Sequence, residues 1–151
     1  MRQLCRRDAL VLGVSGAALT LFGYEEHASA AAKEAADQIA KFTVGKTAES
    51  GRISIELPEI AENGNTVPLL VSVDAPMTAD NYVSEIVVVA DGNPNPGVAT
   101  FHFSPISAKA EASTRIRLAT TQNIIAVAKT SKGDFYTGQK LVKVTIGGCG
   151  G

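Results

Sequence analysis

One cysteine stands among four glycines at the C-terminal end of the chain, in the sequence VTIGGCGG. The glycines are Gly147, Gly148, Gly150 and Gly151, so no bulky residue adjoins Cys149. Glycine adopts nearly any backbone conformation and adds almost no width, which predicts a thin, flexible arm that presents the thiol to a narrow pocket of another protein. An isolated thiol, with a pKa of about 8.5, is a modest nucleophile. We therefore interpret Cys149 as a covalent attachment point rather than as a catalyst.

Residues 1–30 have the three parts of a secretory signal peptide. The paired Arg6 and Arg7 precede a short apolar run, and the segment ends in small residues from Ala28 to Ala30. The run is shorter than the roughly 20 apolar residues that a membrane-spanning helix needs. This pattern predicts cleavage after Ala30. The adjacent arginines indicate export to the periplasm by the twin-arginine route, which carries proteins that are already folded.

Export would leave Cys149 as a single cysteine, because Cys5 lies in the signal peptide. An odd cysteine in an oxidising compartment indicates either a bond to another chain or a free reactive thiol. The net charge of −1 indicates neither nucleic-acid binding nor a basic membrane-binding patch. Proteins and small molecules are therefore the expected partners.

The residues between signal and arm are expected to form one domain, residues 31–146, that positions the arm at 147–151. A helix is predicted from Ala31 to about Phe42, with Gly45 as its stop. Seven strands at short spacing follow it, which predicts a mainly β fold, an immunoglobulin-like antiparallel β-sandwich. The predicted strands are residues 52–57, 66–73, 82–90, 98–104, 113–119, 123–130 and 135–146.

Several local features of these elements can also be predicted. The helix is expected to turn an apolar face to the sheet, made of Ala32, Ala36, Ile39, Ala40 and Phe42. Residues 62–65 are expected to form the turn between the first two strands, and DGNPNPG, residues 91–97, a turn after the third. Pro68 should lie at a sheet edge or near the start of its strand.

The terminal GGCGG closely resembles the end of the SoxY family, the sulfur carriers of the bacterial thiosulfate-oxidising (Sox) system. The segments PEIAENGNTVPL, SPI and GNPNPGVATFHF and the twin-arginine signal support the resemblance, which covers essentially the whole chain after residue 30. It implies that Cys149 covalently holds the sulfur intermediates as an S-thiosulfonate, a persulfide and an S-sulfonate. The chain is then a carrier and not an enzyme.

The resemblance also implies the partners of the chain. These are SoxZ as heterodimer partner, a c-type cytochrome that loads thiosulfate, a manganese thiosulfohydrolase and, where present, a molybdenum sulfane dehydrogenase. The chain itself is expected to hold no metal or other cofactor.

Two other functions fit the residues alone. An exported interaction module would use Cys149 for an interchain disulfide. A copper site would combine a cysteine with histidine and methionine ligands, for which only His102 and Met77 remain after cleavage. We expect His102 to be a strand-face residue and Met77 a packing or loop residue instead.

Overall fold

The computed structural model describes residues 23–148, and it describes side chains from Ala30 onward. The chain divides into two compact units, residues 1–30 and residues 31–151. This division falls where cleavage of the signal is predicted, and the cleavage itself stays a prediction. Arg6, Arg7 and Cys149 lie outside the described residues. No helix in the described part of the chain is long and apolar enough to span a membrane.

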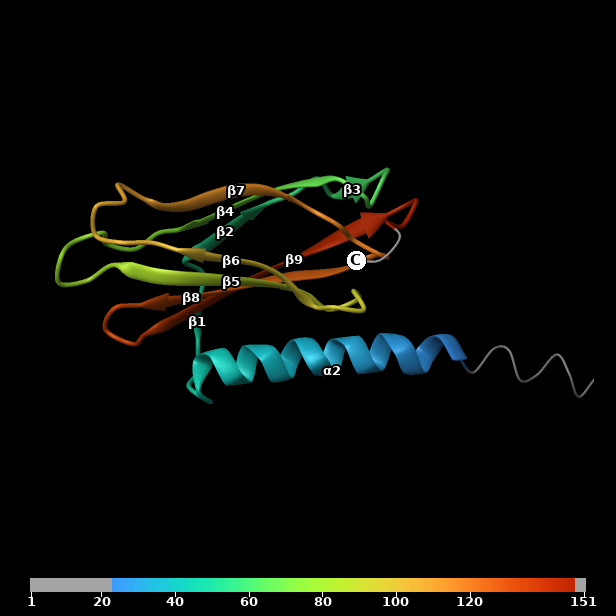
Figure 1. Ribbon diagram of the computed structural model, residues 1–151, viewed down its shortest axis with the longest axis horizontal. Helices are drawn as coiled ribbons and strands as arrows, with labels where there is room; N and C mark the ends of the chain where they lie inside the picture. Colours follow the sequence, from blue (N-terminus) through green and yellow to red (C-terminus); the bar gives the residue numbers. More distant parts are fainter. Residues whose placement is uncertain (1–22, 149–151) are drawn as a thin grey trace, which may run out of the picture. The chain divides into compact units, whose positions relative to one another are not determined.

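Two β-sheets pack face to face in the second unit (Figure 1). The larger is a 6-stranded sheet in the order β1-β9-β8-β5-β6, with β3 also paired to β9, and the smaller is a 3-stranded sheet in the order β2-β4-β7. The strands are β1 (Glu49–Ser50), β2 (Ile53–Glu56), β3 (Ile60–Ala61), β4 (Val67–Val73), β5 (Val83–Ala90), β6 (Gly97–His102), β7 (Ala110–Ile116), β8 (Gln122–Thr130) and β9 (Phe135–Val144).

The seven longer strands confirm the predicted sandwich, because all pairings among them are antiparallel. The two-residue strands β1 and β3 were not predicted, and both pair parallel to β9. They are too short to carry an alternating pattern of their own. As a result, residues 57–66 are not a simple hairpin turn. The chain leaves β2, pairs with the other sheet at β3, and turns at residues 62–65 into β4.

Strand alternation builds the core between the sheets. In β4, Val67, Leu69, Val71 and Val73 are buried, whereas Pro68 is exposed. Because successive strand residues point to opposite faces, this pattern places one face of the smaller sheet in the core. Pro68 is the second residue of β4 and lies beyond the last pairing with β2, Glu56 with Leu70. It therefore lies near the start of its strand, as predicted, although β4 is the central strand of its sheet.

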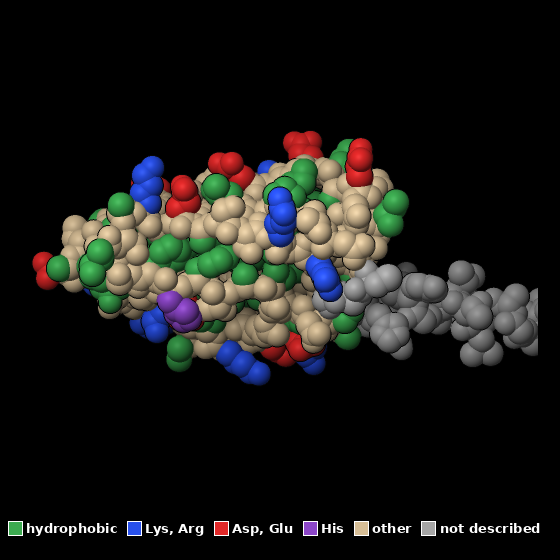
Figure 2. All heavy atoms as spheres, turned by 45° about the horizontal axis from the view of Figure 1, so that its top comes forward, with side chains coloured by type: hydrophobic (Ala, Val, Ile, Leu, Met, Phe, Trp, Pro, Cys, Tyr) green, Lys and Arg blue, Asp and Glu red, His purple; other side chains and the backbone are tan. Residues whose placement is uncertain are grey.

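The sandwich is open on the side where β6 and β7 are the outer strands of their sheets. Figure 2 shows hydrophobic side chains gathered along the middle of this side, with charged side chains at its margins. Val98, Phe101 and Ala112 are among the partly buried residues that pack against the core here. On the opposite side, β2 lies against β9, which closes the sandwich.

The helix α2 (Gly23–Thr43) packs its residues from Ala31 onward against the larger sheet. Phe42 meets Phe135 edge to face, with ring centroids 5.8 Å apart. Ala31 and Ala35 are buried, whereas Ala32, Ala36 and Ala40 are exposed, so the predicted helix face is wrong at these alanines. The other two residues of that face, Ile39 and Phe42, are partly buried. The sequence offers alanine on both sides of the helix, so it does not show which pair of alanines is buried together with Phe42.

Helix α2 ends in a Schellman motif whose left-handed residue is Val44. The amide of Gly45 donates to the carbonyl of Ala40 at 3.1 Å, and that of Val44 donates to Lys41 at 3.3 Å. Val44 has a φ of 54°, a conformation that a β-branched residue rarely adopts. Glycine was expected to stop the helix, and Gly45 is left-handed as well, with a φ of 72°, but the first left-handed residue after the helix is Val44.

Replacing Val44 by glycine should therefore stabilise the protein. We expect Val44→Gly to raise the free energy of unfolding by about 1 kcal/mol, because glycine pays no steric cost in the left-handed region. Denaturant unfolding of both proteins measures this difference. Val44→Ala is the matched control, since it removes the branching but keeps a Cβ, and its gain should be smaller. A loss of stability in Val44→Gly would contradict the assignment of strain to this residue.

Candidate functional site at the base of the C-terminal arm

The chain beyond β9 runs between two loops rather than directly into solvent. β9 ends at Val144, two residues before the predicted end of the strand. Thr145 then donates its amide to the carbonyl of Ala61 at 3.0 Å, and its hydroxyl donates to the carbonyl of Glu62 at 2.9 Å. The last described residues are therefore held beside β3, at the end of the sandwich from which the arm departs (Figure 1).

Three backbone hydrogen bonds link four residues where the chain leaves β9. The amide of Gly64 donates to Ile146 at 2.8 Å, and the amide of Leu118 donates to Gly64 at 2.8 Å. The amide of Gly148 donates to Leu118 at 2.9 Å. We call this set, Gly64, Leu118, Ile146 and Gly148, the arm clamp. It joins the loop before β4, the segment after β7 and the base of the arm.

Close packing requires glycine at two residues of the arm clamp, Gly64 and Gly148, and at Gly147 beside them. A Cβ on Gly64 would overlap the carbonyl oxygen of Leu118, and one on Gly147 would overlap that of Ala119. A Cβ on Gly148 would lie 2.9 Å from the carbonyl oxygen of Gly64, closer than real Cβ contacts. Gly148 is accordingly buried. The flexibility expected of Gly147 and Gly148 stays a prediction, and the structure gives both residues a packing role that the sequence did not indicate.

Cys149, Gly150 and Gly151 lie outside the described residues, and Gly148 is the last residue that the structure describes. Gly148 is held by the arm clamp. The described part of the chain therefore ends at this end of the sandwich.

A buried pair of amide side chains, Asn93 and Gln122, supports the segment that carries Leu118. The Nδ2 of Asn93 donates to the carbonyl of Arg117 at 2.9 Å, and its Oδ1 accepts from the amide of Ala119 at 2.9 Å. Residues 117–119 were predicted to end a strand, but β7 ends at Ile116. Asn93 thus replaces the neighbouring strand that this segment lacks.

Gln122 in turn holds Asn93 in place. Its Nε2 donates to Asn93 Oδ1 at 2.8 Å and to the carbonyl of Thr120 at 2.9 Å, while its Oε1 accepts from the amide of Gly92 at 2.8 Å. The two side chains are only 2% and 4% exposed. Buried amides without partners are costly, so the hydrogen bonds that each side chain makes through both its oxygen and its nitrogen make this corner rigid.

Sequence reasoning missed these residues for identifiable reasons. Asn93 lies in DGNPNPG and Gly64 in the 62–65 turn, and asparagine and glycine are ordinary turn residues. Only the packing of a distant segment distinguishes a buried turn asparagine from an exposed one such as Asn95. Gly64 and Asn93 do lie within the segments that supported the family resemblance. That resemblance was the one signal in the sequence that could have pointed to them.

The other candidate ligands lie where a structural role was expected. His102 lies on the face of β6 with its Nδ1 3.9 Å from Glu85 Oε1, and its side chain is exposed. Met77 packs against the core. Among the residues that the structure describes, no group of three or more histidine, cysteine, aspartate and glutamate side chains could hold a metal ion.

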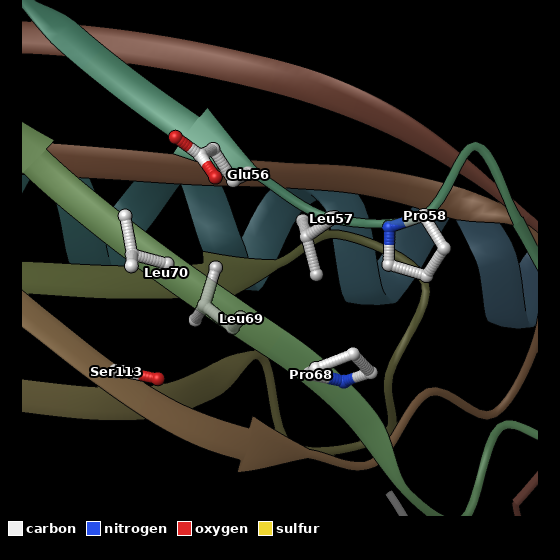
Figure 3. A pocket seen from close by; sticks show the side chains of 7 residues that line it. All are labelled: Glu56, Leu57, Pro58, Pro68, Leu69, Leu70 and Ser113. Atoms are coloured by element: carbon white, nitrogen blue, oxygen red, sulfur yellow. The ribbon is translucent and has the colours of Figure 1, made fainter.

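A shallow pocket on the smaller sheet offers little chemistry. Figure 3 shows its lining, which comes from the end of β2, the start of β4 and one residue of β7. Most of the lining is leucine and proline, and Glu56 and Ser113 supply its carboxylate and hydroxyl groups. A carboxylate and a hydroxyl on an apolar floor suit contact with another molecule better than acid and base catalysis.

Known proteins resemble this chain in both sequence and structure. A family model described as sulfur oxidation protein SoxY matches residues 39–149. The sulfur carrier protein SoxY from Chlorobium limicola f thiosulfatophilum is 36% identical, with a TM-score of 0.60 over 73% of this chain and 94% of that chain. Comparison with curated proteins gives no match.

Two superoxide reductases share the fold at lower identity. The neelaredoxin from Ignicoccus hospitalis is 22% identical, with a TM-score of 0.56 over 62% of this chain and 80% of that chain. A putative superoxide reductase from Thermotoga maritima is 20% identical, with a TM-score of 0.54 over 68% of this chain and 89% of that chain. These likenesses concern the sandwich alone. The match to the family model, by contrast, spans most of the sequence and includes Gly64, Asn93 and Gly148, and the chain belongs to the SoxY family of sulfur oxidation proteins.

Proposed function

We propose that this chain is a periplasmic sulfur carrier in thiosulfate oxidation, with Cys149 as the covalent attachment site. The observation that carries the proposal is the extent of the family match, which runs to residue 149 and so includes the cysteine. The related protein from Chlorobium is described as a sulfur carrier protein. The interchain-disulfide module remains the alternative that the test must distinguish.

The arm clamp supports a carrier more than a catalyst. It is made of backbone amides and carbonyls, so it brings no charged side chain of its own toward the thiol. Reactive catalytic cysteines depend on nearby cations or on a helix N-terminus, which lower the thiol pKa. Cys149 instead follows a fixed glycine at one end of a rigid sandwich. Such an attachment suits a thiol that is activated by the enzymes it visits.

The proposed cycle begins with an oxidation at the thiol. A c-type cytochrome removes two electrons as the Cys149 sulfur joins the sulfane sulfur of thiosulfate, the thiol proton leaves, and an S-thiosulfonate forms. A manganese thiosulfohydrolase then adds water across the bond to the terminal sulfonate and releases sulfate, which leaves a persulfide on Cys149.

The second half of the cycle restores the thiol. A molybdenum sulfane dehydrogenase, where present, removes six electrons from the outer persulfide sulfur while three waters supply its oxygens, which gives an S-sulfonate. Hydrolysis releases a second sulfate and returns the cysteine. The metals and electron acceptors belong to these partner enzymes, and SoxZ is the proposed heterodimer partner of the sandwich.

Substitution of Cys149 should abolish sulfur loading. We expect intact-mass spectrometry of periplasmic protein from thiosulfate-fed cells to show adducts of sulfane sulfur, sulfonate or thiosulfonate mass. Reduction should remove the sulfur, and Cys149→Ser should carry none of it. Cys5→Ser is the matched control and should load normally, because the signal peptide is removed. If the wild-type protein shows only a free thiol or a disulfide-linked dimer, the interaction-module alternative replaces the carrier.

Export should depend on the paired arginines. Changing Arg6 and Arg7 together to lysine keeps the charge but removes the twin-arginine feature, so the chain should accumulate in the cytoplasm. Cell fractionation detects this change, and N-terminal sequencing of wild-type periplasmic protein should begin at Ala31. Arg2→Lys serves as the control and should be exported. Normal export of the double variant would exclude this route.

A further inference from the structure

We propose that Asn93 is a positioning residue for the carrier arm, because its buried side chain holds the segment against which the base of the arm packs. The importance of the arm rests on the proposed function. The positioning itself can be tested without sulfur chemistry, since it concerns hydrogen bonds among described residues.

The segment 117–119 is held along both of its edges. On one edge, the amide and carbonyl of Leu118 bond to Gly64 and Gly148. On the other edge, the carbonyl of Arg117 and the amide of Ala119 bond to the side chain of Asn93. This alternation is the pattern of a strand between two neighbours, with one neighbour reduced to a single carboxamide.

Without Asn93, the segment would lose one of these two edges. The carbonyl of Arg117 and the amide of Ala119 would lose their partners in a part-buried corner, and the Nε2 of Gln122 would lose one of its two acceptors. Buried backbone groups demand partners, so the segment would shift to find water or other bonds. Because Leu118 lies between the two groups, its carbonyl would move away from Gly148.

Release of the arm clamp would change the length of the arm that a partner enzyme binds. With the clamp closed, the chain is held as far as Gly148. Release would free Gly147 and Gly148 and lengthen the part of the chain that the clamp does not hold by roughly 7 Å. A longer arm samples more conformations, and this freedom is lost when the arm enters a pocket. The buried amide pair therefore sets both the point of departure of the thiol and the entropy cost of delivering it.

Hydrogen exchange of the Gly148 amide measures the arm clamp directly. In the full chain with reduced Cys149, we expect NMR to show protection of this amide, which donates to Leu118. Asn93→Ala should speed its exchange by roughly 10- to 100-fold, the effect of leaving one buried group unpaired. Amides of β5 and β8 should stay protected. Asn95→Ala, at an exposed position of the same loop, is the matched control and should leave Gly148 unchanged.

Thiol accessibility provides a second readout that general destabilisation would not reproduce. We expect Asn93→Ala to increase the rate of Cys149 modification by a maleimide attached to a large dextran more than the rate with iodoacetamide, because only the bulky reagent benefits from a longer arm. Val127→Ala, in the buried face of β8, destabilises the fold away from the clamp and should not change this ratio.

Gly64→Ala opens the clamp from the opposite side, since its Cβ would overlap Leu118, and it keeps the test valid if Asn93→Ala does not fold. This variant should also expose the Gly148 amide and raise the ratio of modification rates. If Gly148 is unprotected in the wild-type protein, or if Gly64→Ala releases it while folded Asn93→Ala does not, the proposal for Asn93 is overturned. Protection of Gly148 without any sulfur adduct on Cys149 would instead count against the proposed function alone.

Discussion

The backbone of Leu118, bonded on one side to Gly64 and Gly148, is the contact on which the carrier end of this protein depends. A strand that leaves its sheet must find new partners for its amides and carbonyls. Here those partners are the loop before β4 and the base of the arm itself. The approach is so close that a Cβ on Gly64 or Gly147 has no room. Glycine is therefore required for contact at the base of the arm as well as being suited to motion beyond it.

The buried amides show how a small sandwich stabilises an irregular corner. Asn93 and Gln122 are almost fully buried, and each makes hydrogen bonds through both its oxygen and its nitrogen. Among the buried side-chain polar atoms of the described residues, only Asn81 Oδ1 has no partner. A complete network of this kind rigidifies its surroundings, whereas an incomplete one would cost more than an apolar core. The network therefore fixes the segment to which the amide of Gly148 is bonded.

Most of the fold could be predicted from local patterns. The short spacing of apolar segments located the seven longer strands, and the turn predicted to begin at residue 91 follows β5 and leads into β6. Predictions failed where contact with a residue far away in the sequence determines the local structure. The alanine-rich helix offers alanines on both sides of Phe42, and only its packing in the folded protein shows that Ala31 and Ala35 are the buried ones. The two-residue strands β1 and β3 exist only because β9 lies beside them.

The candidate site also has features that the sequence indicates and features that depend on tertiary contacts. The sequence by itself determined that one cysteine follows a strand and lies among glycines, because residue type and spacing are enough to indicate a thin arm with a thiol. It also placed the chain in its family through segments whose individual roles it could not assign. Only the tertiary structure decided that Gly64, Leu118 and Asn93 meet at the base of that arm. Their contacts join residues far apart in the chain, and hydrogen bonds between distant backbone groups leave no periodic signal in a sequence.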